Sequence, residues 1–258
     1  EYTRMFNRPI LHFAMVPELS DGGVMHEGFE ATRLGLRGIP AAAQDIMTHR
    51  DIALAQLTCG RIHLMCVTTI DSVMQIRQAK AQGIQVTADV TPHHLLLTDK
   101  VMSSFETMYK CNPPLRSQKH VDALIVGLQD GTLSAITSDH QPLALEKKQV
   151  DLDTAPFGIC GIETLLPICI RALIEPGHLT WPQLIARLTT GPAAILGLPH
   201  GTLSVGEPAD VTLIDPAKQW TVRAAEFRSR SRNTPFDGVE FTGKVVKTIV
   251  DGEVRFSE

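Results

Sequence analysis

Several features that define common classes of protein are absent from this 258-residue sequence. No apolar run approaches the roughly 18 to 20 residues that a membrane span requires, and the N-terminus lacks the basic-then-apolar pattern of a signal peptide. The formal net charge of −4 gives no basic footprint for nucleic acid and no polybasic surface for membranes. The remaining classes of function are small-molecule chemistry and protein association.

Cysteine is infrequent in the sequence, and its pattern does not indicate disulfides. There is no Cys-x-x-Cys pair, and an odd number of cysteines in apolar segments suits a reducing compartment better than a disulfide framework. The five are Cys59, Cys66, Cys111, Cys160 and Cys169. We therefore expect a cytoplasmic protein. The apolar share of 43% is enough to bury the core of one large domain, with or without a small appendage.

Short apolar runs alternate with helical patterns over the first half of the sequence. Residues 71–82 and 121–129 have apolar side chains at helix spacing, and each pattern stops at a glycine. This alternation predicts an α/β fold, and the lack of a phosphate-binding glycine loop favours part of a (β/α)8 TIM barrel of the metal-dependent hydrolase type. Strands are predicted at 9–15, 61–68, 84–90 and 135–137, and more weakly at 108–111.

The pattern changes twice after Gly158. Helical segments are predicted first, at 162–174 and 181–196, and the second begins with an N-cap and an early proline in Thr180-Trp181-Pro182. From Gly201 onward, short alternating strands are joined by glycine and aspartate turns, which predicts a small antiparallel β appendage. We therefore predict a barrel unit with its following helices at 1–200 and the appendage at 201–258.

The strand predicted at 135–137 ends in a possible catalytic pair, Asp139-His140. Hydrolases of the barrel type place an acid at such a strand end, where its carboxylate can take a proton from a metal-bound water. An acid at the end of a strand can also simply cap a loop. Asp139 is therefore the candidate general acid/base, and the other metal ligands have to be sought on the remaining strands.

Six segments together resemble the dihydroorotases of the long bacterial type (class I) within the cyclic amidohydrolase superfamily. Each motif alone is weak, but their order and spacing match over nearly the whole sequence. They are Gly23–Gly28, Thr87–Thr98, Asn112–Arg116, Ser138–Pro142, Ala155–Gly158 and Gly206–Asp210. The resemblance implies a reversible cyclisation of carbamoyl aspartate to dihydroorotate in pyrimidine synthesis. It also implies a homo-oligomeric protein.

By this resemblance, the sequence corresponds to the later part of a longer protein. The family's first barrel strands, with the His-x-His pair of its metal site, would precede Glu1, and no His-x-His occurs in the sequence. The β appendage would also take strands from that earlier part. The appendage is therefore expected to expose unpaired edges.

The family's metal is zinc, singly or as a pair, and the resemblance assigns four positions of this sequence to that site. His94 and Asp139 match the family's histidine ligand and catalytic aspartate. Met15 stands where the family has an aspartate that bridges the metals, and a thioether cannot replace a bridging carboxylate for zinc. Cys66 stands in place of a histidine ligand. It is either a weak ligand as a thiolate or a buried inert thiol.

The substrate positions are mixed in the same way. Asn112 matches a residue that hydrogen-bonds the dihydroorotate ring, and Pro156, Phe157 and Gly158 match the segment that closes on it. The family's last histidine of this region, which contacts the substrate carboxylate, is Leu143 here. The loop 145–153 is charged and either moves over the pocket or is a plain solvated connection.

Three hypotheses follow from these replacements. The first is an active zinc dihydroorotase that takes its missing ligands from an N-terminal segment. The second is a dihydroorotase-like homologue that has lost catalysis at Met15, Cys66 and Leu143 and persists as a structural partner of aspartate transcarbamoylase. The third is a decaying reading frame. We favour the second and third over the first, because membership of a fold does not guarantee a working site.

Overall fold

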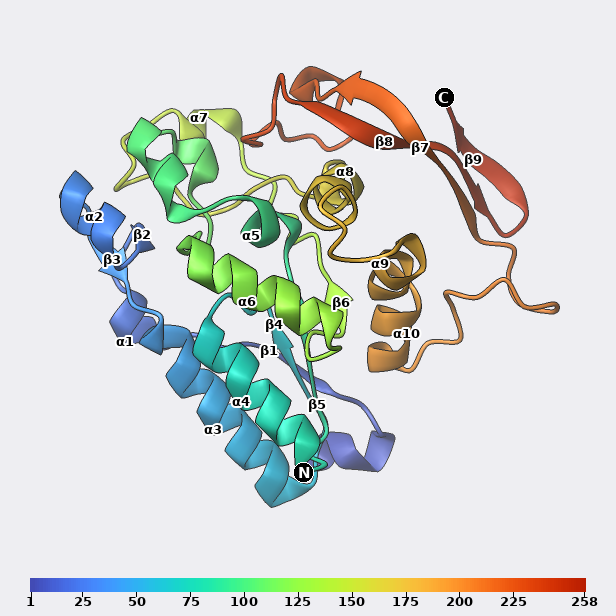
Figure 1. Ribbon diagram of the computed structural model, residues 1–258, viewed down its shortest axis with the longest axis horizontal. Coiled ribbons are helices and arrows are strands. Elements are labelled where there is room, and N and C mark those ends of the chain that lie inside the picture. Colours follow the sequence, from blue (N-terminus) through green and yellow to red (C-terminus); the bar gives the residue numbers. More distant parts are fainter.

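A computed structural model describes residues 1–258, and its centre is a four-stranded parallel sheet with the order β1-β4-β5-β6 (Figure 1). The register pairs Ile10 with Ile62 and Ile62 with Val86, so β1, β4 and β5 start level with one another, whereas β6 begins opposite Asp89, near the end of β5. Parallel strands covered on their faces read as continuous apolar runs, which is the pattern of this sequence. The strands are β1 (Ile10–Phe13), β4 (Ile62–Met65), β5 (Val86–Val90) and β6 (Ala135–Ile136).

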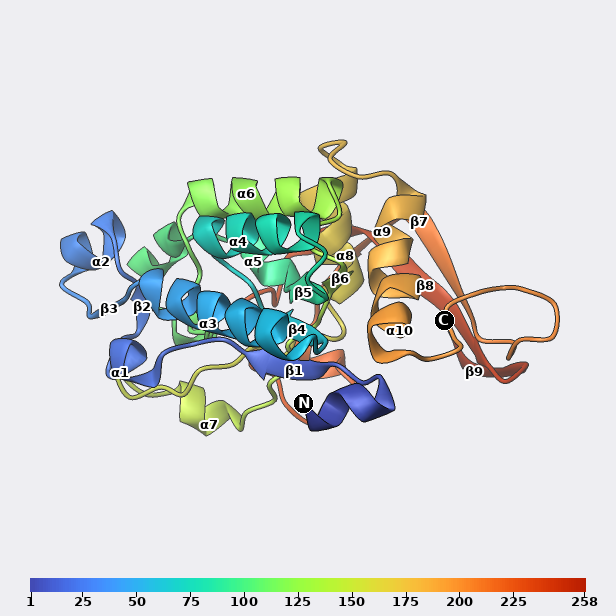
Figure 2. The ribbon, with the colours of Figure 1, turned by 90° about the horizontal axis from the view of Figure 1, so that it is seen from below.

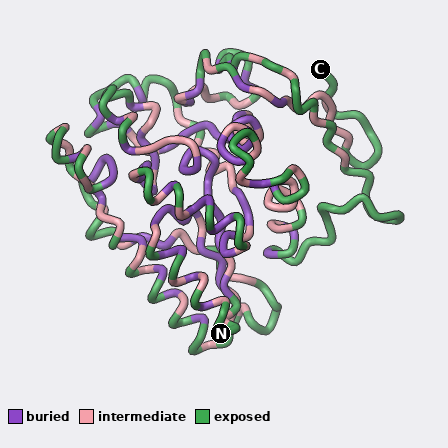
Figure 3. Tube along the Cα trace, in the orientation of Figure 1, coloured by how far each residue is buried: buried purple, intermediate pink, exposed green.

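Three helices lie side by side along one side of this sheet, as Figures 1 and 2 show: α3 (Ala42–Thr58), α4 (Ile70–Ala81) and α6 (Gln118–Gln129). Helix α4 begins where the Thr69 hydroxyl accepts a hydrogen bond from the Ser72 amide, at 3.3 Å. Its buried face carries Val73, Ile76 and Ala79. These side chains join Leu64, Ala88, Val90 and others in a core of 24 buried residues. Figure 3 shows this interior in purple.

The predicted α/β fold is confirmed, and the sheet corresponds to part of a barrel. Two local predictions were wrong. Residues 108–111 form no strand, since the chain makes a short 3-10 turn at η3 (Thr107–Tyr109). The helix predicted at 181–196 is two helices, α9 (Trp181–Leu188) and α10 (Thr190–Leu196), because Thr189 between them leaves the helical region of backbone space, with φ −128° and ψ −82°.

The helix expected at 162–174 is shorter at its start and changes geometry midway. It begins as α8 (Leu165–Cys169) and continues as a π-helical turn, η4 (Ile170–Ile174). The remaining short elements connect the larger ones. They are η1 (Tyr2–Phe6), α1 (Pro17–Ser20), β2 (Met25–His26), α2 (Phe29–Leu34), β3 (Gly38–Ile39), α5 (Pro92–Leu96), η2 (Asp99–Ser104), α7 (Leu145–Lys148) and η5 (Ala224–Glu226).

A second sheet is built from the C-terminal residues. It is antiparallel, with the order β7 (Val211–Thr221), β8 (Glu240–Val250) and β9 (Glu253–Ser257). Strands β7 and β9 each pair only with β8, so both outer edges are unpaired. Phe236 and Phe241 pack with Cys160 and Ile168 in a small core that joins this sheet to the preceding helices. The domain boundary at residue 200 stays a prediction. No helix of the chain is long and apolar enough to cross a membrane.

Candidate metal and catalytic site

The candidate residues converge at one end of the parallel sheet. Met15, Cys66 and Asp139 each lie within three residues after strands β1, β4 and β6, and His93 and His94 follow β5. Because the carboxyl ends of parallel strands meet at the same edge, residues far apart in the sequence become neighbours there. This edge of the sheet is the place to test whether the donors of a metal site are present.

Asp139 lies half-buried just beyond β6, with a left-handed backbone at φ 43°. Burial raises the pKa of its carboxyl. A hydrogen bond from Gln141 Nε2, at 2.8 Å, opposes the rise, and the nearby charge of Asp89 adds to it. The backbone of Gly161 lies very close to the residue before Asp139, since a Cβ atom at Gly161 would be 2.3 Å from the Ser138 carbonyl oxygen. A carboxyl with a raised pKa at a strand end can exchange a proton, so the general acid/base role stays a prediction that this geometry supports.

Met15 is buried in an apolar cluster. It packs with Ile39 and Ala43, and the partly buried Phe13 and Phe157 pack against this cluster. The position that the resemblance assigns to the bridging carboxylate thus holds a neutral group in apolar surroundings, and the assignment itself stays a prediction. Phe157, which was expected to close on a substrate, packs against the same cluster.

Cys66 is also buried, with a left-handed backbone at φ 54°. Burial raises the pKa of its thiol well above the usual value, and the charges of Asp89, Asp139 and Cys111 raise it further. The thiol is therefore protonated at neutral pH, whereas zinc binds a thiolate. The assignment of Cys66 as a weak ligand stays a prediction.

A buried aspartate that the sequence motifs did not indicate as functional organises the residues around Cys66. Asp89 accepts a hydrogen bond from the Cys66 amide at 2.7 Å and one from His63 Nε2 at 2.9 Å. His63 in turn contacts the Thr87 hydroxyl at 2.9 Å, so its ring has partners at both nitrogens. The sequence signal for this role was an aspartate inside the apolar run 84–90, because a buried carboxylate needs several hydrogen-bond donors.

His12, on β1, belongs to a different surface. Its Nδ1 lies 2.5 Å from the Asp51 carboxylate on α3, so this histidine ties β1 to α3.

The neighbouring histidines do not continue strand β5, because helix α5 begins at Pro92. His94 has partners at both ring nitrogens: Nδ1 lies 2.6 Å from the Thr91 hydroxyl, and Nε2 donates to the Pro113 carbonyl at 2.9 Å. Burial lowers the pKa of His94 to about 4. His93 is equally buried, but its Nε2 has no hydrogen-bond partner. The ring nitrogen without a partner is therefore on His93, while the ligand assignment of His94 stays a prediction.

The substrate positions also divide. The Oδ1 atom of Asn112 is buried and has no hydrogen-bond partner, so it is free to accept a hydrogen bond from a ligand. Leu143 is held through its backbone amide, which donates to Asn233 Oδ1 at 3.0 Å, and its side chain offers no charge to an anion. The roles of Asn112, Pro156, Phe157, Gly158 and Leu143 toward a substrate stay predictions.

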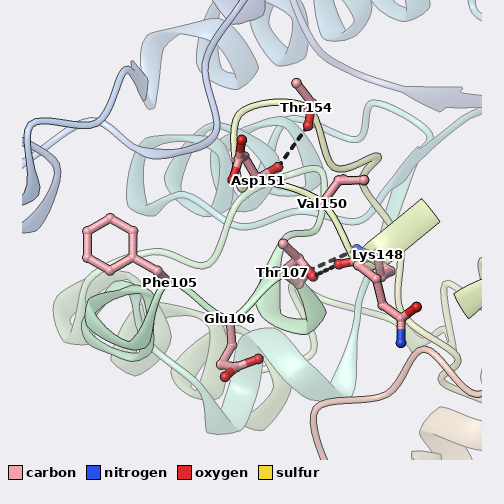
Figure 4. Close-up of a pocket in the computed structure, with 8 residues that line it drawn as sticks. Phe105, Glu106, Thr107, Lys148, Val150, Asp151 and Thr154 are labelled. Atoms are coloured by element: carbon pink, nitrogen blue, oxygen red, sulfur yellow. Dashed lines mark hydrogen bonds between the residues drawn. The ribbon is translucent and has the colours of Figure 1, made fainter. Parts of the chain in front are cut away.

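The charged loop that begins at α7 is pinned by a buried lysine. Lys148 Nζ donates to the carbonyls of Thr107, Lys110 and Pro156, at 3.0, 3.1 and 2.8 Å. Figure 4 shows Lys148 beside Thr107 at a pocket of about 570 Å³ on this side of the loop. Lys110 Nζ donates to the Leu152 carbonyl at 2.6 Å and lies 4.8 Å from the centre of the Phe157 ring. These contacts fix the segment whose Phe157 packs against the cluster of Met15, Ile39 and Ala43.

The donor set of this chain does not fit a carboxylate-bridged pair of zinc ions. The position that the resemblance assigns to the bridging carboxylate holds a neutral thioether buried in an apolar cluster. A metal pair needs negative ligands to hold two cations together, and none replaces the missing carboxylate here.

Comparison with known proteins shows the class of this chain. The amidohydrolase family matches residues 34–255, and the chain belongs to this family, whose members are typically metal-dependent. The fold agrees: an L-hydantoinase (dihydropyrimidinase) from Arthrobacter aurescens superposes with a TM-score of 0.88 at 28% identity, over 98% of this chain and 58% of that one.

Among members of the family, the chain is similar to dihydroorotases, the group that the motifs indicated. It is 47% identical over 260 residues to a dihydroorotase of Anaeromyxobacter dehalogenans (strain 2CP-C), which covers 100% of this chain and 60% of that protein. It is 42% identical over 258 residues to a dihydroorotase of Acetivibrio thermocellus, covering 100% of this chain and 61% of that protein. The chain thus spans about 60% of the length of these relatives.

Proposed function

We propose that this chain is part of a dihydroorotase-type protein of pyrimidine synthesis that has lost hydrolytic activity and acts as a structural partner of aspartate transcarbamoylase. The observation that carries the proposal is the burial of Met15 among Ile39, Ala43, Phe13 and Phe157. An apolar cluster fills the position where a working site of this type has its bridging carboxylate. The relatives named dihydroorotase support the pathway, and the donor set supports the loss of activity.

The chemistry explains why this change is decisive. In the family reaction, bound zinc polarises the amide carbonyl of the ring and lowers the pKa of a water molecule. Asp139 alone can accept and return a proton, but it cannot generate a strong nucleophile at neutral pH. Leu143 also offers no charge to the carboxylate of carbamoyl aspartate or dihydroorotate. Substrate binding and activation are therefore both impaired.

The structural role is supported by what the chain keeps. Its parallel sheet, its core of 24 residues and the Asp89 network are retained although the metal position is apolar. The form Asp139-His140-Gln141-Pro142 also resembles family members that hold aspartate transcarbamoylase in an assembly. A homo-oligomeric, cytoplasmic protein without a nucleic-acid or membrane partner is part of this proposal.

A second candidate function is an active zinc dihydroorotase completed by an N-terminal segment. The observation that favours it is the unpartnered Nε2 of His93, which follows β5 at the end of the sheet where Asp139 follows β6. In that case Asp139 is the general acid/base, and His94, with Cys66 as a weaker donor, contributes to the zinc site.

One experiment separates the two candidates. The chain is expressed alone and fused to the N-terminal part of the Anaeromyxobacter dihydroorotase, and each protein is assayed for dihydroorotate hydrolysis, zinc content and binding of purified aspartate transcarbamoylase. We expect no turnover from either protein, together with a complex with the transcarbamoylase. Turnover with stoichiometric zinc would overturn the proposal, as would the absence of any complex.

A matched variant tests whether the replaced positions are the cause. In the fused protein, Met15→Asp, Cys66→His and Leu143→His together are expected to raise the zinc content above that of the unchanged fusion, while Met15→Leu with the same two changes is not. Failure of the first variant to gain zinc would show that the assigned positions do not form the site.

A further inference from the structure

A cluster of metal donors lies behind the candidate site and includes a residue to which the resemblance assigns no role. His93, His94 and Cys111 are all buried, and one nitrogen or sulfur atom of each lies within 4.8 Å of those of the other two. The two imidazole rings come from α5, with their centres 4.6 Å apart. Cys111 comes from the segment before Pro113, so two separate parts of the chain converge on one point.

The hydrogen bonds of this cluster converge on a single backbone oxygen. His94 Nε2 donates to the Pro113 carbonyl at 2.9 Å, and Cys111 Sγ donates to the same oxygen at 3.3 Å. His94 Nε2 and Cys111 Sγ are themselves 4.0 Å apart. Two protons thus point at one acceptor, and a cation placed between these atoms would replace both.

His93 supplies the observation that points to a ligand. It is 2% exposed, and its Nε2 has no hydrogen-bond partner. Leaving a buried polar group unpaired costs about 1 to 3 kcal/mol, so such atoms in native proteins require an explanation. A bound cation accepts the lone pair of a neutral imidazole and removes that cost.

We propose that His93, His94 and Cys111 bind a single divalent cation of the zinc class, with the Pro113 carbonyl oxygen as a fourth donor. Two imidazoles, one thiolate and one further ligand in a tetrahedral arrangement form a donor set that suits Zn²⁺. On binding, the Cys111 thiol loses its proton to the buffer, and the proton of His94 moves from Nε2 to Nδ1. There it is donated to the Thr91 hydroxyl, which lies 2.6 Å away.

This site differs from the family's metal pair in its ligands and in its consequence. It shares only His94 with the positions that the resemblance assigns to that pair, and it needs neither a bridging carboxylate nor a His-x-His pair. It does not involve Met15, so it does not rest on the proposed loss of hydrolysis. Its predicted effect is structural, because the cation would tie α5 to the turn that carries Asn112.

The test uses the full chain in a Cys59→Ser background, since Cys59 is exposed and could bind metal adventitiously. Metal-free protein is titrated with Co²⁺, whose absorption reports thiolate ligation directly, and then with Zn²⁺ in competition. We expect one equivalent of Co²⁺, a thiolate-to-metal charge-transfer band, and displacement of Co²⁺ by Zn²⁺. A titration without stoichiometric binding, or binding without the thiolate band, overturns the proposal.

Variants assign the ligands. Cys111→Ser keeps a donor for the Pro113 carbonyl and is expected to abolish the thiolate band and to weaken binding by about 100-fold or more. Thr91→Val, which removes only the partner of His94 Nδ1, should weaken binding by roughly 10- to 100-fold. Cys169→Ser changes an equally buried thiol away from the cluster and should alter neither value. Retention of the band in Cys111→Ser would refute the site even if the variants differ in stability.

Discussion

Two parts of the same sheet edge have opposite chemical character. After β4, β5 and β6, polar side chains remain and are organised, with Asp89 bound to His63 and to the Cys66 amide and with Asp139 half-buried nearby. After β1, the equivalent position is Met15 in an apolar cluster. A parallel sheet can thus keep the frame of a hydrolase site while one strand end becomes part of the core. Retention of some site residues is therefore not proof of the activity.

Removal of Asp89 should have the largest effect on stability, because this carboxylate organises the polar part of the sheet edge. Asp89→Ala leaves the Cys66 amide and His63 Nε2 buried without an acceptor. We expect the free energy of unfolding to fall by about 3 to 5 kcal/mol, measured by urea denaturation. Asp122→Ala, an exposed change on α6, is the control. A loss below about 1 kcal/mol would mean that the network contributes little.

Introducing a charge on the apolar side should have the next largest effect. Met15→Asp places a carboxyl among Ile39, Ala43 and Phe157, and we expect a loss of about 2 to 4 kcal/mol at pH 7 without metal. Burial raises the pKa of such a carboxyl above its unfolded value of about 3.9, so the penalty grows as the pH rises above about 4 and is small below it.

The control for that variant is Met15→Leu, which keeps the volume and should cost less than about 1.5 kcal/mol. Denaturation curves at pH 3.5 and pH 7 distinguish the two changes. Equal stability of Met15→Asp and the unchanged chain at pH 7 would show that the position is open to water and has not become core.

Lys148 affects the apolar part of the sheet edge from outside the sheet. It holds the segment whose Phe157 packs against the cluster of Met15. Lys148→Met removes three hydrogen bonds to backbone carbonyls, and a loss of about 2 to 3 kcal/mol is expected. Burial lowers the pKa of Lys148 to about 8, below the roughly 10.4 of an unfolded lysine.

The folded chain therefore releases this proton first, and its stability should rise from about pH 8 to about pH 10.4. The rise should be missing in Lys148→Met and present in Lys147→Met, which alters an exposed neighbour. Identical pH profiles for all three proteins would contradict the assignment.

The smallest effect is expected at Gln141. Gln141→Ala removes the hydrogen bond to Asp139 Oδ1, which lowers the pKa of that carboxyl, so the already raised pKa should rise further. Stability should change by no more than about 1 kcal/mol because both residues are only half-buried. A titration of the Asp139 carboxyl followed by NMR measures the shift, and Gln129→Ala serves as the control. A fall in the pKa would contradict the hydrogen-bonding role.

Much of the fold was predictable because its signals are local. The apolar runs gave β1, β4, β5 and β6, and helix spacing with a terminal glycine gave α4 and α6. Asp139 was found because a strand-end acid is recognisable in the sequence. The predictions at 108–111 and at Thr189 failed because their signals were incomplete. A short segment without alternation does not establish a strand, and a continuous helical pattern does not show where the helix is interrupted.

The candidate site was only partly predictable, for a geometrical reason. Sequence spacing placed His93 and His94 together but could not tell which ring nitrogen lacks a partner, because that depends on Thr91, Pro113 and the start of α5. Asp89 was visible only as a polar residue in an apolar run. Its partners come from β4, which the sheet register brings beside it.

By itself, the sequence determined the class of fold and the family, since each depends on residue types and their order, and it placed a methionine at position 15. Only the tertiary structure decided the surroundings of Met15. Phe157 packs against its cluster from a segment far along the chain, and two buried lysines donate to the backbone carbonyls of Leu152 and Pro156 in that segment. Burial and hydrogen-bond partners are set by atoms brought together in space, so the apolar cluster, the protonated Cys66 and the unpartnered His93 nitrogen could not be read from the sequence.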